Sequence, residues 1–466
     1  MFRIVFAGFA RQMLILGLIF SANTFGFAQK KQNKAQEVKL DPDAAVVSLI
    51  REAVHPLTNS ERDYDPLMEI IGDARFVMLG EATHGTHEFY RERARITRRL
   101  IEEKGFNAVV IEADWTDAYR VNRFVRGEGI DKNAERALSG FERFPQWMWR
   151  NKDFRDFVNS IRSYNESRSA GTNKVGIFGM DLYGLTESID AVVNYLKTVE
   201  PEAARRARKR YGCFARFREN PQLYGYEINS GTARSCQKEA QQQFDELQQL
   251  VAKQARNAKS NNELFNAYQN ARVVKNAEAY YRAIYSRNIS SWNLRDQHMA
   301  DTLNALASHI ESGEGKPAKI VVWAHNSHQG DARMTERASA GEHNVGQLIR
   351  QQHKNDTVLV GFTTYTGYVR AASEWNAPDE RKKVRPALEG SYSALFHKTG
   401  VPNFLLLLRD KGNLSRELST FRLQRAIGVI YLPRTERASH YFLARIAKQF
   451  DAVIHFDVTS AVEPIH

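Results

Sequence analysis

Short apolar runs rich in β-branched residues recur along this chain, and stretches of helical length separate the first of them. Strands that alternate with helices are typical of βαβ units, which build a mainly parallel sheet. The runs are apolar almost throughout, as expected of strands that helices cover on both faces. We therefore predict an α/β fold with a mainly parallel central sheet flanked by helices. The eight predicted strands are Phe76–Leu79, Ala108–Ile111, Val175–Phe178, Ile320–Trp323, Val358–Phe362, Phe404–Leu408, Ile427–Tyr431 and Val453–Phe456.

The alternation of strands and helices breaks between about residues 200 and 312. This stretch has almost no strand signal and is rich in Gln, Ala, Arg, Lys and Glu, which predicts several helices. We expect residues 46–466 to form one domain, with a large helical insertion at about 200–312 between two strands of the sheet. Such an insertion would form one wall of a cleft.

The N-terminus has the order of regions that is typical of a secretory signal peptide. An apolar stretch runs from Met13 to Phe20, and the small residues of Gly26-Phe27-Ala28 precede a polar segment. We predict a signal peptide over residues 1–28, a polar segment over 29–45 and a periplasmic or secreted protein. An uncleaved anchor is the alternative. The mature part has no apolar run long enough to cross a bilayer, so no stable membrane span is expected after cleavage.

Cys213 and Cys236 are the two cysteines of the sequence. In an oxidising compartment, an even pair separated by a modest loop predicts a disulfide. Two free thiols are the alternative. Neither cysteine belongs to a CxxC motif, so thiol redox chemistry is not expected.

The chain is basic, with a formal net charge of +12 that falls to +10 once the two arginines of residues 1–28 are removed. Much of the excess lies on one predicted helix, without an aromatic platform or a nucleic-acid motif beside it. We expect this helix face to be solvated, and we predict no nucleic-acid partner. Its basic residues are Arg205, Arg206, Arg208, Lys209 and Arg210.

Ionisable or hydrogen-bonding side chains follow four of the predicted strands, at the point where each strand ends. In open α/β sheets, ligands bind outside the carboxyl ends of the strands. A single acid at such a place is usually a helix cap, but His, Glu or Asp at four strand ends together predict a functional cleft. The residues are Glu81 and His84 after the first strand, Glu112, Asp114 and Trp115 after the second, Asp181 after the third, and His325 and His328 after the fourth.

The helix predicted after His84 carries one arginine, Arg93, on its apolar face. With Phe89 as the reference, Arg93 falls within about 40° of the apolar stripe at about 100° per residue, whereas the other arginines point elsewhere. A buried arginine needs a carboxylate or an anion. A structural ion pair with Glu81 or Glu112 and a role in orienting a carboxylate or stabilising an oxyanion both stay open.

Histidine and carboxylate chemistry is the reaction type that these residues favour. The sequence has no G-x-S-x-G motif, which disfavours a serine hydrolase of the common α/β type. His84 is expected at the start of a helix, where the helix dipole lowers the pKa of an imidazole and keeps it neutral, able to take a proton from water. Glu81 or Glu112 would fix its tautomer. His325 would polarise a carbonyl, bind the oxyanion or protonate the leaving alkoxide.

A metal site is the main alternative. His84, His87 and Glu88 form H-x-x-H-E, and His325 and His328 form a second H-x-x-H. Neither motif matches the H-E-x-x-H or H-x-x-E-H pattern of metalloproteases, although such a set is able to hold zinc or manganese. We predict no metal and no cofactor. A metal-dependent hydrolase and a non-catalytic envelope protein that binds a ligand in the cleft are the competing functions.

Five segments between Arg75 and about Val369 carry a family resemblance: LGEATHGTHEFYRERARITRRLIEEKGFNAVVIEADW, SWNLRDQHMADTL, IVVWAHNSHQGDAR, NVGQL and VGFTTYTGYV. They resemble the erythromycin esterase family. The resemblance implies that residues 46–466 form the catalytic domain. It also implies hydrolysis of a small-molecule ester or lactone by water, without a covalent serine intermediate. A macrolide lactone is the substrate that the family name suggests, but the export signal sets this chain apart from the antibiotic-inactivating members.

The resemblance also implies roles for individual residues. The general base of the family falls on His84, and the other matching catalytic positions are Glu81, Arg93, Glu112 and His325. The remaining polar residues of the predicted cleft and its first helix are candidates for substrate binding. These are His87, Glu88, Asp114, Trp115, Asp181 and His328.

Overall fold

The computed structural model describes residues 42–169, 171–255, 261–286, 290–409 and 411–465. The predicted signal peptide and most of the predicted polar segment lie outside the described residues. The first helix, α1 (Ala44–Ala53), begins two residues before the predicted start of the domain. Among the described residues, none of the helices combines the length and the hydrophobicity that a membrane crossing requires.

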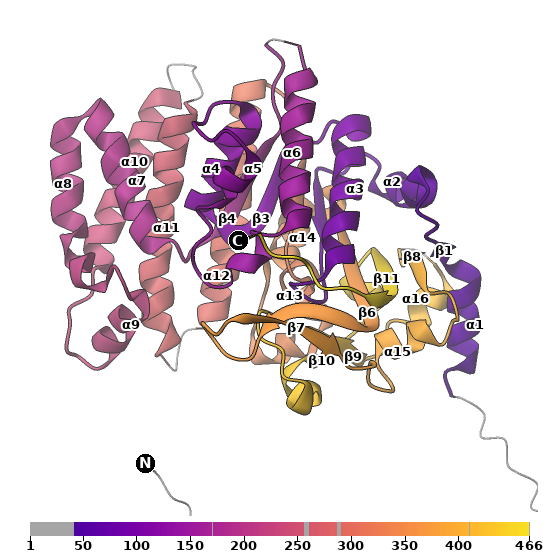
Figure 1. The fold of residues 1–466 in the computed structure, drawn as a ribbon. Coiled ribbons are helices and arrows are strands. Elements are labelled where there is room, and N and C mark those ends of the chain that lie inside the picture. The colour runs from indigo at the N-terminus through magenta and orange to yellow at the C-terminus, as the bar shows by residue number, and fades with distance from the viewer. Residues whose placement is uncertain (1–41, 170, 256–260, 287–289, 410, 466) are drawn as a thin grey trace, which may run out of the picture. The chain divides into compact units, whose positions relative to one another are not determined.

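The central sheet of the unit that begins at Asp43 has nine strands, and six neighbouring strands run parallel (Figure 1). In spatial order these are β11 (Ala452–Thr459), β6 (Thr357–Ala372), β2 (Phe76–Leu79), β5 (Ile320–Trp323), β3 (Ala108–Asp114) and β4 (Gly176–Asp181). Three strands pair antiparallel: β8 (Asn403–Leu407) with β11, β1 (His55–Pro56) with β8, and β7 (Asp379–Val384) with β6. The predicted α/β fold with a mainly parallel sheet is confirmed.

Side chains of the central strands alternate between two hydrophobic cores, one on each face of the sheet. In β2, Val77 and Leu79 belong to one core, and Phe76 and Met78 belong to the other. Because both faces are buried, the strands are apolar throughout. The first core is covered by α2 (Asp65–Ile71), α3 (His87–Lys104), α4 (Trp115–Arg126), α5 (Ala134–Leu138) and α6 (Lys152–Ser167). The second is covered mainly by α1, α12 (Ser291–Glu314), α14 (Val345–His353), α15 (Tyr392–His397), α16 (Asn413–Glu417) and α18 (Ile446–Gln449).

Seven of the eight predicted apolar runs are strands of this sheet, and the eighth, Ile427–Tyr431, requires a correction. Ile427 and Ile430 make isolated bridges to Thr83 and Ala372 instead of joining a ladder. Ile427 and Tyr431 are fully buried in a small cluster with residues of β6 and β7. The segment is therefore apolar because it packs against the sheet, not because it pairs within it.

Four strands were not among the predicted ones, including the two-residue strand β1. β7 has the sequence DERKKV, and β9 (Arg422–Arg425) has the sequence RLQR, so neither shows an apolar run. β9 pairs antiparallel with β10 (Tyr441–Ala444) in a separate two-stranded ribbon. β7 pairs with the end of β6 just before it in the chain, so backbone hydrogen bonds hold these polar strands, and a hydrophobic pattern does not report such bonds.

The predicted helical insertion lies between β4 and β5 and begins somewhat earlier than expected, at Leu185. Its first five helices have a hydrophobic core of their own and lie on the left in Figure 1. The last helix, α12, instead packs on the sheet. The first five are α7 (Leu185–Val199), α8 (Pro201–Tyr211), α9 (Pro221–Asn229), α10 (Gln237–Ala255) and α11 (Asn262–Ile284).

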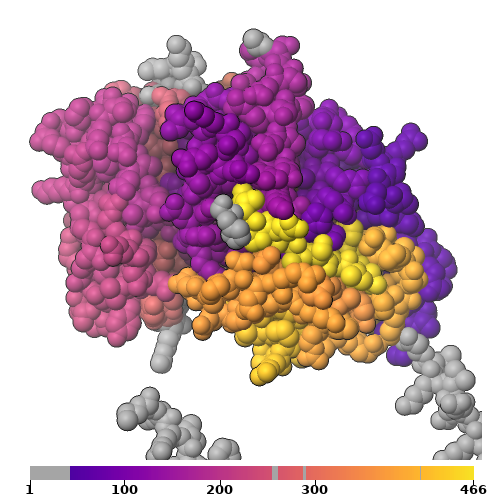
Figure 2. Space-filling model, viewed as in Figure 1, coloured from indigo at the N-terminus to yellow at the C-terminus, as the bar shows by residue number. Residues whose placement is uncertain are grey.

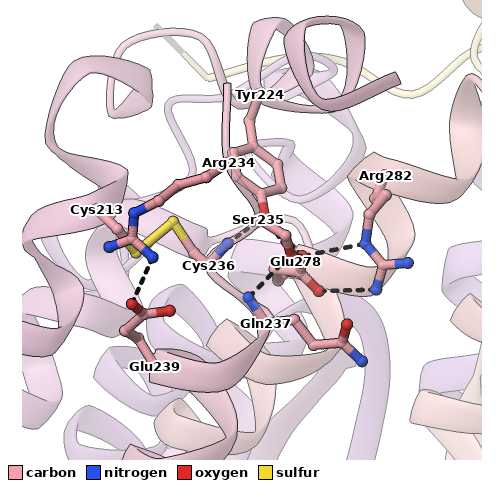
Figure 3. The surroundings of a disulfide bond; sticks show 9 residues. All are labelled: Cys213, Tyr224, Arg234, Ser235, Cys236, Gln237, Glu239, Glu278 and Arg282. Atoms are coloured by element: carbon pink, nitrogen blue, oxygen red, sulfur yellow. Dashed lines mark hydrogen bonds and ion pairs between the residues drawn. A yellow bond between two sulfur atoms is a disulfide. The ribbon is translucent and has the colours of Figure 1, made fainter. Parts of the chain in front are cut away.

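The predicted disulfide between Cys213 and Cys236 is present in the insertion (Figure 3). It joins the 3-10 helix η3 (Gly212–Phe217) to the residue that precedes α10. Beside it, the buried carboxylate of Glu278 accepts a hydrogen bond from Tyr224 at 2.6 Å and pairs with Arg282. The disulfide and this polar cluster together tie α9 and α10 to α11.

Candidate active site

His84 lies in the loop between β2 and α3, at the carboxyl edge of the parallel sheet. Its backbone N–H donates to the carbonyl oxygen of Ile427 at 3.3 Å, and the carbonyl oxygen of Gly85 accepts from the N–H of Arg370 at 3.0 Å. A side chain at Gly85 would clash with the backbone of Arg370, so glycine permits this close approach. The loop is thus held by two segments from the C-terminal part of the chain.

Glu81 and Arg93 support His84 from behind. Nδ1 of His84 lies 2.7 Å from Oε1 of Glu81, and the Arg93 guanidinium forms an ion pair with Oε2 of Glu81 at 2.7 Å. Arg93 is completely buried, and its Cζ lies over the rings of Tyr90 and Trp323, 4.5 and 4.8 Å from their centroids. Of the two carboxylates that the sequence offered as partners, Arg93 pairs with Glu81. The placement of Arg93 on the buried face of α3 is confirmed.

The pKa of His84 is shifted in the direction opposite to the expected one. α3 begins at His87 with Thr86 as its N-cap residue, so His84 stands outside the helix. Burial lowers the pKa of His84, but the hydrogen bond to Glu81 and the charges of Glu112 and Glu81 outweigh it, and the net result is a raised pKa. The expected lowering by the helix dipole is therefore wrong, because nearby carboxylates dominate.

Glu112, at the end of β3, is held as a carboxylate by charged neighbours. Its Oε2 accepts from the backbone N–H of His325 at 2.9 Å, and its Oε1 accepts from Arg295 at 2.8 Å. Burial alone would raise the pKa of Glu112, but the charges of His328, Arg295 and His84 and the N–H of His325 hold it well below its usual range. Glu112 therefore adds a negative charge next to His84 at every pH of interest.

His325 faces His84 across the site, with ring centroids 4.9 Å apart. Its Nδ1 accepts from the backbone N–H of Ser327 at 3.2 Å and lies 2.8 Å from the hydroxyl of Ser327, which places the ring proton on Nε2. Burial and the charge of His84 lower the pKa of His325 well below its usual value, so the ring is neutral. Nε2 lies near the carbonyl oxygen of Ala82 but makes no well-aligned hydrogen bond. Nε2–H is therefore a buried donor without a well-aligned acceptor among the described residues.

His328 is fixed by contacts on both ring nitrogens. Nδ1 lies 2.9 Å from a carboxylate oxygen of Asp296, and Nε2 lies 3.0 Å from the guanidinium of Arg295. Nε2 also lies 3.3 Å from Oε1 of Glu112, so the ring stands between two carboxylates and the Arg295 guanidinium. The ring also stacks on Trp292, with centroids 4.4 Å apart.

These groups surround a single cavity of about 320 Å³. Six of the predicted site residues line it: His84, Glu112, Asp114, Asp181, His325 and His328. Aromatic side chains form much of the remaining wall: Phe141, Trp149, Tyr183, Trp292 and Trp375. The cavity therefore pairs a polar floor with an apolar wall, as small-molecule sites commonly do.

The sequence model of the erythromycin esterase family matches residues 101–459, which is most of the chain. The chain belongs to the erythromycin esterase family. As a member of this family, the protein is a hydrolase that acts on ester bonds.

Relatives of this esterase extend over nearly its whole length. The erythromycin esterase type II of Escherichia coli is 22% identical over 444 residues, which cover 88% of this chain and 96% of that protein. A crystal structure of a Bacillus cereus protein has 20% identity and a TM-score of 0.73, covering 92% of this chain and 100% of its own. A mutant of the erythromycin esterase EreC in its open conformation has 17% identity and a TM-score of 0.61, covering 87% and 95%. These two structures show that the fold is shared.

Three residues of the esterase that were predicted to bind substrate do not line the cavity. Trp115 is buried in a core, where its indole N–H donates to Asn266 at 2.8 Å. The ring of His87 bonds to Asp153 at 2.7 Å. Glu88 accepts from the backbone N–H of Ser460 at 2.8 Å. It thereby anchors the C-terminal segment, coloured yellow in Figure 2.

Sequence reasoning expected the helical insertion to form one wall of the cleft but missed the individual residues that the insertion and the loops contribute to the cavity. Arg295 and Asp296 come from α12, inside a segment that carries the family resemblance but no strand end. The resemblance of SWNLRDQHMADTL was the available signal for them. Trp375 follows β6 and lines the cavity, and 49% of its surface is exposed. Its ring packs against that of Phe144, with centroids 5.0 Å apart.

Asp117 of α4 is a further acid of the cavity that the sequence did not single out. Burial and the charges of Asp114 and Glu187 raise the pKa of Asp117 to about 8, although Arg143 opposes this. The raised pKa favours the protonated form of the Asp117 carboxyl, which is a hydrogen-bond donor on the cavity wall.

Among the described residues, no group of three or more His, Cys, Asp or Glu side chains is arranged to hold a metal ion. The histidines of the two H-x-x-H motifs bond to different partners. His87 bonds to Asp153, whereas the rings of His325 and His328 bond to Ser327 and Asp296.

Proposed function

We propose that this protein hydrolyses a carboxylic ester or lactone with a water molecule that His84 activates. The proposal rests on one observation: the carboxylate of Glu81 occupies Nδ1 of His84, which leaves Nε2 for a water in the cavity. A carboxylate on Nδ1 fixes the tautomer and stabilises the imidazolium that forms, as the acid of a catalytic triad does. The buried charge of Glu112 adds to this stabilisation.

In the proposed reaction, the water oxygen attacks the carbonyl carbon while its proton passes to Nε2 of His84. The carbonyl oxygen becomes an oxyanion, toward which the Nε2–H of His325 would donate. Collapse of the tetrahedral intermediate breaks the bond to the alcohol oxygen, and the imidazolium of His84 returns the proton to that oxygen. The products are a carboxylic acid and an alcohol, which form one molecule when the substrate is a lactone.

The substrate we propose is a small molecule with an apolar portion that packs on Trp292, Trp375 and Tyr183. A macrolide lactone is one candidate, because a relative is an erythromycin esterase. Simple esters of organic acids are equally compatible with a cavity of about 320 Å³.

The test is a hydrolysis screen of the purified protein against macrolides and simple esters, with His84→Ala alongside. For any ester that responds, we expect His84→Ala to lower kcat by about 10³-fold, the range typical of a lost general base. His87→Ala is the matched control, since His87 lies three residues away and outside the cavity, and it should retain full activity.

The pH profile gives a second reading of the same experiment. Only the neutral imidazole accepts a proton, so kcat/KM should rise as the pH passes upward through the pKa of His84. Because that pKa is raised, the acid limb should lie above the ordinary histidine value of 6.5. Wild-type activity in His84→Ala would overturn the proposed mechanism.

We also propose that the protein is exported and acts in the periplasm or outside the cell. The order of regions in residues 1–28 supports this, as does the disulfide between Cys213 and Cys236, since disulfides persist in oxidising compartments. Expression of the full chain, with recovery of the protein from the periplasm or medium, should yield a mature N-terminus near residue 29. A cytoplasmic protein that retains residues 1–28 would contradict export.

A further inference from the structure

Arg295 of α12 connects three neighbouring parts of the carboxyl edge of the sheet. One terminal nitrogen donates to Glu112 at 2.8 Å and to Asp181 at 2.6 Å, and Nε donates to Asp181 at 3.0 Å. The other terminal nitrogen lies 3.0 Å from Nε2 of His328. The partners follow or end β3, β4 and β5, which are adjacent in the sheet.

The shape of the guanidinium suits this bridging position. Arginine presents five donors in a rigid plane, so one side chain is able to hold several acceptors at defined angles. The side chain of Arg295 is 13% exposed, and those of Glu112 and Asp181 are 4% and 3% exposed. Without a cation between them, two buried carboxylates would repel each other and would each carry a large desolvation cost.

We propose that Arg295 is a positioning residue for ester hydrolysis: its guanidinium holds Glu112, Asp181 and His328 in one arrangement around the base His84. This inference rests on the proposed function, in which His84 activates water. Arg295 itself touches no reacting atom in the proposed reaction. It acts through Glu112, whose carboxylate also accepts the N–H of His325 and so determines where that ring stands.

Arg295 also opposes the carboxylates that raise the pKa of His84. The titratable groups around His84 are Glu81 from its own loop, Glu112 from β3, His325 and His328 from the segment after β5, and Arg295 from α12. Loss of this positive charge would remove its opposition to the carboxylates, and the pKa of His84 would rise further. Substitutions at Arg295 therefore separate the effect of its charge on the pKa of His84 from its effect on the positions of Glu112, Asp181 and His328.

The test compares Arg295→Met with Arg295→Lys on an ester that the wild type hydrolyses. We expect Arg295→Met to lower kcat by about 100-fold, the cost of displacing a catalytic group by roughly 1 Å, and to move the acid limb of kcat/KM to higher pH. Arg295→Lys keeps the charge but not the planar fork. It should therefore lower kcat less while leaving the acid limb near its wild-type position.

Arg282→Met is the matched control, because it removes a bidentate ion pair from the same insertion, with Glu278, away from the cavity. It should lower the melting temperature without moving the pH profile. Wild-type kcat and pH profile in Arg295→Met would overturn the inference. If that variant does not fold, unchanged kcat in Arg295→Lys overturns it instead. If His84→Ala is inactive and the Arg295 variant is unaffected, this inference alone is rejected. If His84→Ala is active, the proposed function is rejected as well.

Discussion

Single residues in the interior of this esterase carry charges that are costly without a partner. Arg93 and Glu81 are both fully buried, and the Glu81 carboxylate is shared between the Arg93 guanidinium and Nδ1 of His84. A buried ion pair adds little net stability, but removing one member leaves an uncompensated charge in the core. The pair therefore makes the orientation of His84 depend on Arg93, a residue outside the cavity.

Arg93→Met should therefore destabilise the protein strongly. We expect a loss of about 3–5 kcal/mol in the free energy of unfolding, the range typical of a broken buried pair, measured by urea denaturation. Arg98→Met is the matched control on the same helix, because 60% of the Arg98 side chain is exposed. Its effect should stay within about 0.5 kcal/mol. Equal urea midpoints for the two variants would contradict the assigned role of Arg93.

Among the elements, the helical insertion has the greatest independence. Helices α7 to α11 pack around their own core, and α12 then returns to the sheet and brings Arg295 and Asp296 to the cavity. The disulfide between Cys213 and Cys236 closes a loop with a sequence separation of 23 residues within this insertion. A cross-link of this kind stabilises mainly by restricting the unfolded chain.

Removing the disulfide should thus weaken the insertion first. The double variant Cys213→Ser, Cys236→Ser should lose about 3 kcal/mol of stability, the value expected for a loop of about this length. Thermal unfolding with and without reductant measures the effect: reductant should lower the melting temperature of the wild type but leave the double variant unchanged. A wild type that is insensitive to reductant would argue against a stabilising role for the bridge.

Across the whole described unit, the order of the parallel strands decides which residues meet. β2, β5, β3 and β4 are neighbours in space, so the residues that follow them converge although they lie far apart in the chain. The C-terminal part contributes in the same way. Ala426, Gly428 and Val429 line the cavity because their segment packs across the end of β2 instead of forming the predicted strand.

Local sequence patterns were sufficient for much of this architecture. Apolar runs identified seven strands, helical phase identified Arg93 as a buried arginine, and the cysteine pair identified the disulfide. The residues that follow the strands pointed to six of those that line the cavity. The strands and the buried helix face are visible in short stretches of sequence, because side-chain direction and burial repeat with the period of the strand or helix.

The sequence by itself thus determined the strands, the edge of the sheet that carries the cavity, and the polar groups at its strand ends. Only the tertiary structure decided how these groups act on one another. It directed the ring of His87 to Asp153 and buried Trp115 in a core, and it added Arg295 from the insertion. It also reversed the expected pKa shift of His84. The reason is physical: a charge interaction depends on the distance between segments that are remote in sequence, and strand order sets that distance.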